Sequence, residues 1–72
     1  MSEETAFSIF CLESYKEHRG LTGKETFDLF TKYGVFDYLE EFYDVLHTTG
    51  YQYINTDLDA YLTARNAFFS AL

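Results

Sequence analysis

A single cysteine in a chain of 72 residues limits how this protein can be stabilised. Cys11 has no second cysteine to pair with, so neither an internal disulfide nor a cysteine-rich zinc cluster can hold the fold together. A chain this short forms one domain, because each half alone would bury too little surface to fold. The eight phenylalanines and seven tyrosines must supply most of the core. We therefore expect a single domain over residues 1–72 with an aromatic core.

The net charge of the chain indicates which classes of partner it can bind. Twelve Asp and Glu against five Lys and Arg give a net charge of -7, which disfavours direct binding to DNA or RNA. No apolar run approaches the ~18 residues that a membrane helix needs, and the N-terminus opens with acidic residues rather than a basic export signal. A lone cysteine without such a signal suits a reducing cytoplasm. We expect a cytoplasmic protein whose acidity serves either solubility alone or attraction to a basic protein surface.

Helix-start and helix-stop signals divide the first two thirds of the chain. Ser2 can cap a first helix, and Thr22 with Glu25 has the spacing of a capping box at the start of a second. Gly20 and Gly34 can take the left-handed conformation that ends a helix. The helices expected from these signals span about residues 3–18, 23–33 and 35–47.

The stretch after residue 47 breaks the helical period. Turn-forming residues are followed by an alternating segment at 51–54, which predicts a short extended connector or an edge that pairs with another chain. Asn55 or Thr56 can cap a last helix that extends to about residue 69. The simplest architecture is all-α, a compact domain of four short helices.

The apolar faces of these helices define the expected core. Leu39, Phe42 and Leu46 are expected at its centre, and Cys11 within its aromatic stripe as a residue dispensable for activity. Arg65 lies among the apolar positions of the last helix, where its guanidinium either reaches solvent or enters a buried pair. The other expected core positions are Phe7, Phe10, Tyr15, Phe27, Leu29, Phe30, Tyr33, Val35, Tyr38, Val45, Leu58, Tyr61, Leu62, Phe68 and Phe69.

Seven residues are candidates for a protein-binding surface. Four carboxylates at helical spacings i, i+3, i+4 and i+7 align along the third helix, either as a solvated face or as a stripe that attracts a basic partner. Two tyrosines project to one side of the extended segment, as interface anchors or as a lid on the core. One isoleucine falls among the charges of the first helix. These residues are Asp37, Glu40, Glu41, Asp44, Tyr51, Tyr53 and Ile9.

Histidines are the remaining candidates for chemistry. We expect His47, Thr48 and Gly50 to form a helix-ending turn in which Gly50 has a positive φ and His47 bonds backbone. The alternative is a small enzyme centred on His47 with Tyr43 and Asp44. His18 fits a position at the end of a helix. Two distant histidines and one cysteine give no metal-ligand spacing, and nothing indicates a cofactor.

Several segments together resemble a known family. They are Phe10-Cys11-Leu12-Glu13-Ser14-Tyr15, Leu21-Thr22-Gly23-Lys24-Glu25, Tyr43-Asp44-Val45-Leu46-His47-Thr48-Thr49-Gly50, Tyr53-Ile54 and Asp57-Leu58. The chain is similar over about residues 6–62 to short bacterial proteins catalogued as a domain of unknown function. Some relatives are encoded beside toxin-like ADP-ribosyltransferases, so the resemblance implies an accessory or neutralising partner rather than an enzyme.

The functional expectation combines this resemblance with the acidic charge. We expect a non-enzymatic protein-binding module, antitoxin-like or accessory to a toxin enzyme, with self-association left open. The alternative is an acidic inhibitor that imitates nucleic acid and blocks a nucleic-acid enzyme.

Overall fold

In the computed structural model, which describes residues 1–68, all regular secondary structure is α-helical. The all-α prediction is therefore confirmed. The helices are α1 (Glu3–Arg19), α2 (Gly23–Lys32), α3 (Val35–Glu41), α4 (Tyr43–Leu46) and α5 (Tyr51–Ala64).

Local capping fixes where the first two helices begin. The Ser2 hydroxyl accepts the N–H of Thr5 at 3.1 Å, and Gly20 ends α1 with φ 67°. The predicted capping box is present: the N–H of Glu25 donates to Thr22 Oγ1 at 3.1 Å, and the N–H of Thr22 donates to Glu25 Oε1 at 2.9 Å. These contacts lie within one turn of helix, which is why the sequence predicts them.

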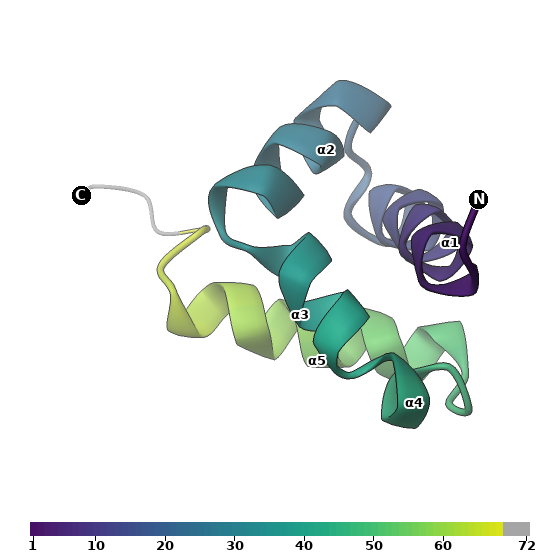
Figure 1. Cartoon of the computed structure of the whole chain (residues 1–72). Coiled ribbons are helices and arrows are strands. Elements are labelled where there is room, and N and C mark those ends of the chain that lie inside the picture. The colour runs from purple at the N-terminus through teal and green to yellow at the C-terminus, as the bar shows by residue number, and fades with distance from the viewer. Residues whose placement is uncertain (69–72) are drawn as a thin grey trace.

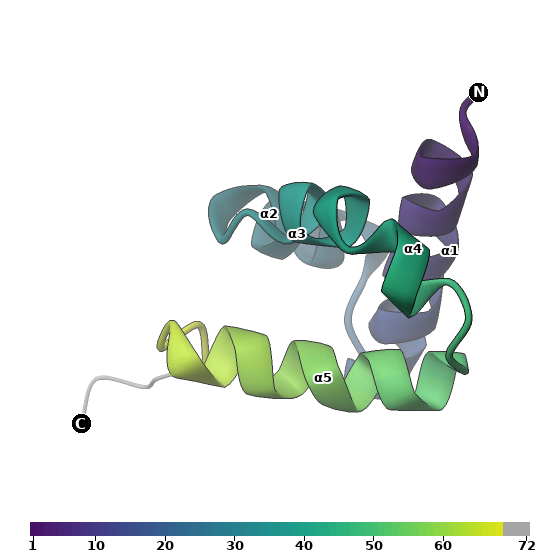
Figure 2. The same ribbon diagram turned by 60° about the horizontal axis from the view of Figure 1, so that its bottom comes forward.

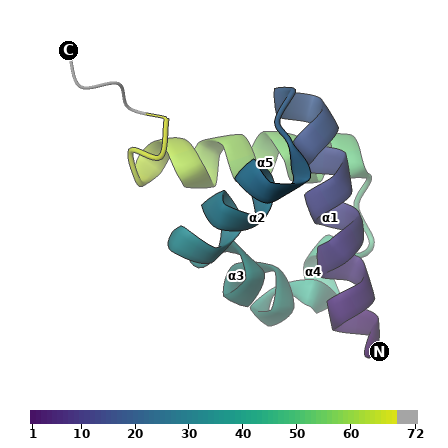
Figure 3. The same ribbon diagram turned by 90° about the horizontal axis from the view of Figure 1, so that it is seen from above.

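The helices are arranged in two layers with α1 across one end. Figure 1 shows α5 beneath α2 and α3, and Figure 2 shows the separation between these layers from a second direction. Seen from above in Figure 3, α1 runs across the direction of α5. Helix α1 packs against α2, α3 and α5, and so joins the two layers.

The core lies where α1 meets both layers. Cys11 and Leu39 are fully buried and Leu46 is 5% exposed, which confirms three of the expected core positions. Burial raises the pKa of the Cys11 thiol to about 12, so this side chain stays a neutral thiol. The buried hydrophobic residues are Phe7, Cys11, Tyr15, Phe30, Val35, Leu39, Leu46, Ile54, Leu58 and Leu62.

The expected third helix is interrupted at Phe42. Its φ of -102° and ψ of 19° separate α3 from α4, so the prediction of one helix over 35–47 is wrong. The break lets Tyr43 meet Phe7 edge-on, with ring centroids 5.3 Å apart, while Leu46 remains in the core. No glycine or proline marks the break, so the local signals in the sequence did not predict it.

Residues 51–54 form the first turn of α5, so the predicted extended segment is wrong. The N–H of Ile54 donates to the carbonyl of Gly50 at 3.1 Å. Ile54, Leu58 and Leu62 recur every four residues and are all fully buried. This helical stripe outweighs the short alternation of tyrosines, and it moves the start of the helix upstream of Asn55 and Thr56.

The last helix also ends earlier than predicted. It stops at Ala64, and Asn66 takes a left-handed φ of 61° that asparagine tolerates better than most residues. Phe68 is partly buried against the core, whereas the expected core position Phe69 lies outside the described residues.

Four expected core residues are instead exposed. These are Phe10 at 59%, Phe27 at 54%, Phe42 at 44% and Val45 at 65%. A domain this small cannot enclose all of its aromatic residues, because most of its volume lies close to the surface. Within residues 1–68, no helix combines the length and the apolar character needed to cross a membrane.

Candidate protein-binding face

The four candidate carboxylates are exposed, and the three on α3 keep the spacings i, i+3 and i+4, so they lie within about 100° of one another around that helix. Asp37, Glu40 and Glu41 belong to α3, whereas Asp44 follows the break and belongs to α4. Asp37 and Glu41 border one pocket beside α3, and Glu40 borders a second pocket. None of the four forms an ion pair with a cation of residues 1–68.

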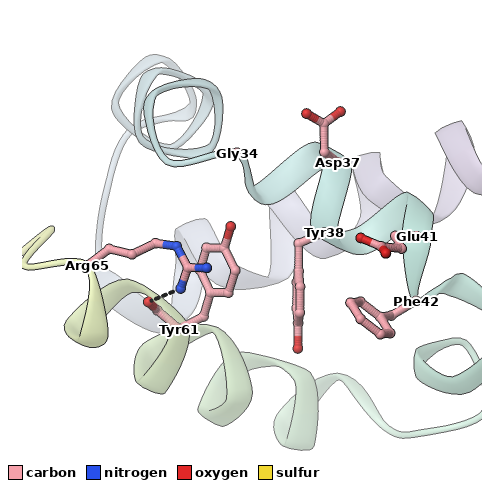
Figure 4. Close-up of a pocket in the computed structure, with 7 residues that line it drawn as sticks. All are labelled: Gly34, Asp37, Tyr38, Glu41, Phe42, Tyr61 and Arg65. Carbon is pink, nitrogen blue, oxygen red and sulfur yellow. Dashed lines mark hydrogen bonds between the residues drawn. The ribbon is translucent and has the colours of Figure 1, made fainter.

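The first pocket, which we call the α3–α5 pocket, is open to solvent and has a volume of about 370 Å³. Figure 4 shows Glu41 and Phe42 on one side of the Tyr38 ring, with Tyr61 and Arg65 on the other side. Its lining residues are Gly34, Asp37, Tyr38, Glu41, Phe42, Tyr61 and Arg65.

Hydrogen bonds hold the aromatic wall of this pocket in place. The Tyr38 hydroxyl donates to Asp57 Oδ2 at 2.5 Å, and the Tyr61 hydroxyl donates to the carbonyl of Tyr33 at 2.8 Å. The two tyrosine rings lie with centroids 4.6 Å apart, and the Phe42 ring lies 5.1 Å from Tyr38. Burial and the bond to Asp57 raise the pKa of Tyr38 to about 12, so its hydroxyl remains a donor at neutral pH.

Arg65 lies at the other end of the pocket from Glu41. Its Cζ is 3.5 Å from the centroid of the Tyr61 ring, and its NH1 donates to the carbonyl of Tyr61 at 3.1 Å. The residue is exposed, as expected for a guanidinium that reaches solvent, and it makes no ion pair with a carboxylate of residues 1–68. The contact is a cation–π stack between Tyr61 of α5 and the residue that directly follows this helix, four positions along the chain.

The second pocket, which we call the α1–α3 groove, is apolar and has a volume of about 300 Å³. Ile9 of α1 and Phe27 of α2 line it and are 44% and 54% exposed. The rings of Phe27 and Phe36 lie with centroids 5.6 Å apart. The groove brings Ile9 together with Glu40 and is completed by Thr5 and Ser8.

Tyr51 and Tyr53, the remaining candidates for the protein-binding surface, lie away from both pockets. Tyr51 and Tyr53 are 44% and 60% exposed. Residues two apart on an α-helix point about 160° away from each other, so these two tyrosines do not share one side as predicted. Neither tyrosine lines the α3–α5 pocket or the α1–α3 groove.

The residues after α4 form a backbone-bonded turn. Nδ1 of His47 donates to the carbonyl of Tyr43 at 2.7 Å, and the His47 ring stacks on the Tyr43 ring with centroids 4.4 Å apart. The Thr48 hydroxyl donates to the carbonyl of Val45 at 2.8 Å. Gly50 has a φ of -77°, so the predicted positive φ is wrong; the residue instead precedes α5 with extended backbone.

A polar cluster around Asp59 was missed by the sequence analysis. Asp59 Oδ1 accepts the Tyr15 hydroxyl at 2.6 Å, Oδ2 lies 2.7 Å from His18 Nε2, and Arg19 NH1 lies 3.5 Å from Oδ1. The bonds join the end of α1 to α5 across 40 residues or more, so no local spacing reveals them. The only signal was the phenol of Tyr15, which needs a partner once its ring is buried.

The electrostatics of this Asp59 cluster favour the ionised carboxylate. Partial burial alone would raise the pKa of Asp59, but the hydrogen bonds from Tyr15 and His18 and the charge of Arg19 hold it below its usual value. Burial and the bond to Asp59 raise the pKa of Tyr15. In the part of the chain that the structure describes, no three His, Cys, Asp or Glu side chains are grouped to hold a metal.

No curated protein and no solved structure matches the chain. A family model does match, over residues 6–65, and its description is "Protein of unknown function (DUF3791)". The matched range includes all of α2 to α5 and most of α1. The chain therefore belongs to the family of proteins of unknown function DUF3791.

Proposed function

We propose that this protein is a non-enzymatic protein-binding module that holds a basic segment of a partner protein on α3. The proposal rests on the position of α3 between two open pockets of different character. The α3–α5 pocket is acidic and aromatic, and the α1–α3 groove is apolar with Glu40 at its rim. A segment that crosses α3 can place a basic side chain on one side and an apolar side chain on the other.

Charge adds to this complementarity. Residues 33–64 include no lysine or arginine, so the carboxylates of α3 and Asp44 have no nearby cation in the sequence. Like charges three or four residues apart on a helix repel by a few tenths of a kcal/mol per pair. The cations of a partner would relieve this repulsion, and the net charge of -7 would speed their approach.

Two other functions are less well supported by the geometry. An inhibitor that imitates nucleic acid would present its carboxylates as one array, whereas Glu40 borders a different pocket from Asp37 and Glu41, and Asp44 is separated from all three by the break at Phe42. An enzyme centred on His47, Tyr43 and Asp44 would need these residues at a pocket. None of them lines the α3–α5 pocket or the α1–α3 groove.

Reversing two charges on α3 tests the proposal. The partner is first captured from the native host with the tagged protein and identified by mass spectrometry, which also shows whether it is a toxin-like enzyme, as the family resemblance implies. Glu40→Lys/Glu41→Lys should then lower the association rate with the purified partner about tenfold at low ionic strength, because local attraction is lost. Both residues are exposed, so the melting temperature should stay the same or rise slightly.

The control makes the same charge change elsewhere. Glu13→Lys/Glu17→Lys alters two exposed residues of α1 that line neither pocket. This variant should keep most of the wild-type association rate. Equal rates for the two double variants would contradict a docking site on α3 and leave only long-range attraction by the net charge. Competition by DNA or RNA for the partner would favour the imitation of nucleic acid instead.

A further inference from the structure

We propose that the α3–α5 pocket receives an arginine side chain of the partner, with its guanidinium stacked on the aromatic wall and paired with Glu41. The inference rests on the proposed function, because it names the side chain that the basic segment contributes. It follows from the aromatic surface, the carboxylates at its rim, and a guanidinium contact that the chain already makes in the same pocket.

The chain itself shows that this aromatic wall accepts a guanidinium. Arg65 stacks on Tyr61 with its Cζ 3.5 Å from the ring centroid. Phe42 is 44% exposed. Its ring lies beside Glu41 on the other side of Tyr38, as Figure 4 shows. This second aromatic surface carries no cation of residues 1–68, and an arginine from outside can use it as Arg65 uses Tyr61.

The charges of the pocket favour a cation in spite of Arg65. Two carboxylates, those of Asp37 and Glu41, and one guanidinium, that of Arg65, line the pocket, which leaves one net negative charge among the lining residues. Glu41 lies next to Phe42, so one guanidinium can stack on the ring and donate hydrogen bonds to the carboxylate. Asp37, whose side chain points away from the aromatic rings in Figure 4, adds a second negative charge to the lining residues.

Arginine fits this pocket better than lysine. A planar guanidinium can stack on an aromatic ring and still direct its N–H groups sideways to a carboxylate, which a compact ammonium cannot do. The bonds from Tyr38 to Asp57 and from Tyr61 to Tyr33 already fix the wall, so little side-chain ordering is needed on binding.

A small arginine probe tests this assignment without the partner. Nα-acetyl-L-arginine N-methylamide is titrated into the isotopically labelled protein, and chemical shifts are followed at Gly34, Glu41 and Phe42. We expect saturable shifts with a dissociation constant in the millimolar range, as befits one side chain. The neutral citrulline analogue should bind about tenfold more weakly, and the lysine analogue about threefold more weakly, because each loses part of the stacking and pairing.

Matched variants locate the probe. Glu41→Gln should weaken binding about fivefold, in line with the loss of one partly exposed ion pair. Phe42→Leu should weaken it about threefold through the lost ring. Glu17→Gln, which removes one charge from the exposed face of α1, should leave the affinity unchanged. Equal binding of the citrulline or lysine analogue, equal weakening by Glu17→Gln, or no saturable shift at the pocket would each overturn the assignment.

The two proposals fail in different ways. If the probe does not bind while Glu40→Lys/Glu41→Lys still slows association with the partner, the arginine site is contradicted and the docking face on α3 is supported. If the probe binds as expected but charge reversal on α3 leaves the association rate unchanged, the docking face on α3 is contradicted and the arginine site is supported.

Discussion

Replacing Phe30 with alanine should lower the free energy of unfolding by about 3–5 kcal/mol, which is close to the whole stability expected of a domain this size. Phe30 is fully buried, and its ring centroid lies 5.8 Å from that of Tyr15 and 5.4 Å from that of Phe36. Truncation would remove its contacts with α1 and α3 and leave a cavity. Urea denaturation followed by circular dichroism measures the change in the free energy of unfolding. A variant that is already unfolded without urea would also agree with the expected loss.

Phe42→Ala is the matched control, since it removes the same atoms. Phe42 is 44% exposed and packs on Tyr38 rather than in the core, so its truncation should cost only about 1 kcal/mol. A loss as large as that of Phe30→Ala would contradict the structure and restore the sequence-based prediction that Phe42 lies at the centre of the core.

Replacing Asp59 with alanine should have the second largest effect. The Tyr15 side chain is fully buried, and without Asp59 its hydroxyl loses the acceptor that lies 2.6 Å away. A buried donor left without a partner costs about 1–3 kcal/mol. Asp28→Ala is the control, because Asp28 pairs with Lys24 on the exposed surface of α2 and this pair should contribute less than about 0.5 kcal/mol.

The carboxylate of Asp59 should make the stability of the fold depend on pH. The folded state lowers the pKa of Asp59 from 3.8, so Asp59 stabilises the fold at neutral pH. Asp59 starts to lose this contribution when the pH falls below 3.8, the ordinary pKa of the carboxyl group in the unfolded chain. The contribution is gone once the pH lies below the lower pKa of the folded state, where the carboxylate is protonated in both states. The stability difference between wild type and Asp59→Asn should therefore shrink over that range. A difference that stays constant with pH would contradict the role of the ionised carboxylate.

Local signals explain what the sequence could predict. The Ser2 cap, the Thr22–Glu25 box and the Gly20 stop involve residues within about one turn of each other, so spacing alone locates them. Leu39 and Leu46, seven residues apart, stay on the core side in spite of the break between them. The family resemblance over residues 6–62 likewise agrees with the match over residues 6–65.

Long-range packing explains what the sequence could not predict. The break at Phe42 accompanies the contact of Tyr43 with Phe7, and the Asp59 cluster joins residues 40 or more positions apart. The α3–α5 pocket depends on the approach of Tyr61 to Tyr38, which no periodicity indicates. The α1–α3 groove is lined by Ile9 of α1, Phe27 of α2 and Phe36 of α3, three residues on separate helices whose proximity no local spacing indicates. Within the α3–α5 pocket, the Tyr61–Arg65 and Tyr38–Phe42 contacts had a local signal, since each joins residues four apart in the sequence.

Site-specific photo-crosslinking tests the docking face most directly. The photoreactive amino acid p-benzoylphenylalanine replaces one exposed phenylalanine at a time: Phe42 in the α3–α5 pocket, Phe27 in the α1–α3 groove, or Phe10, which lines neither. Each variant is illuminated in lysate of the native host, and its crosslinked products are identified by mass spectrometry. The account predicts that positions 42 and 27 crosslink the same partner and that position 10 does not. Crosslinking of the partner from position 10 alone, or equally from all three positions, would contradict a docking face on α3.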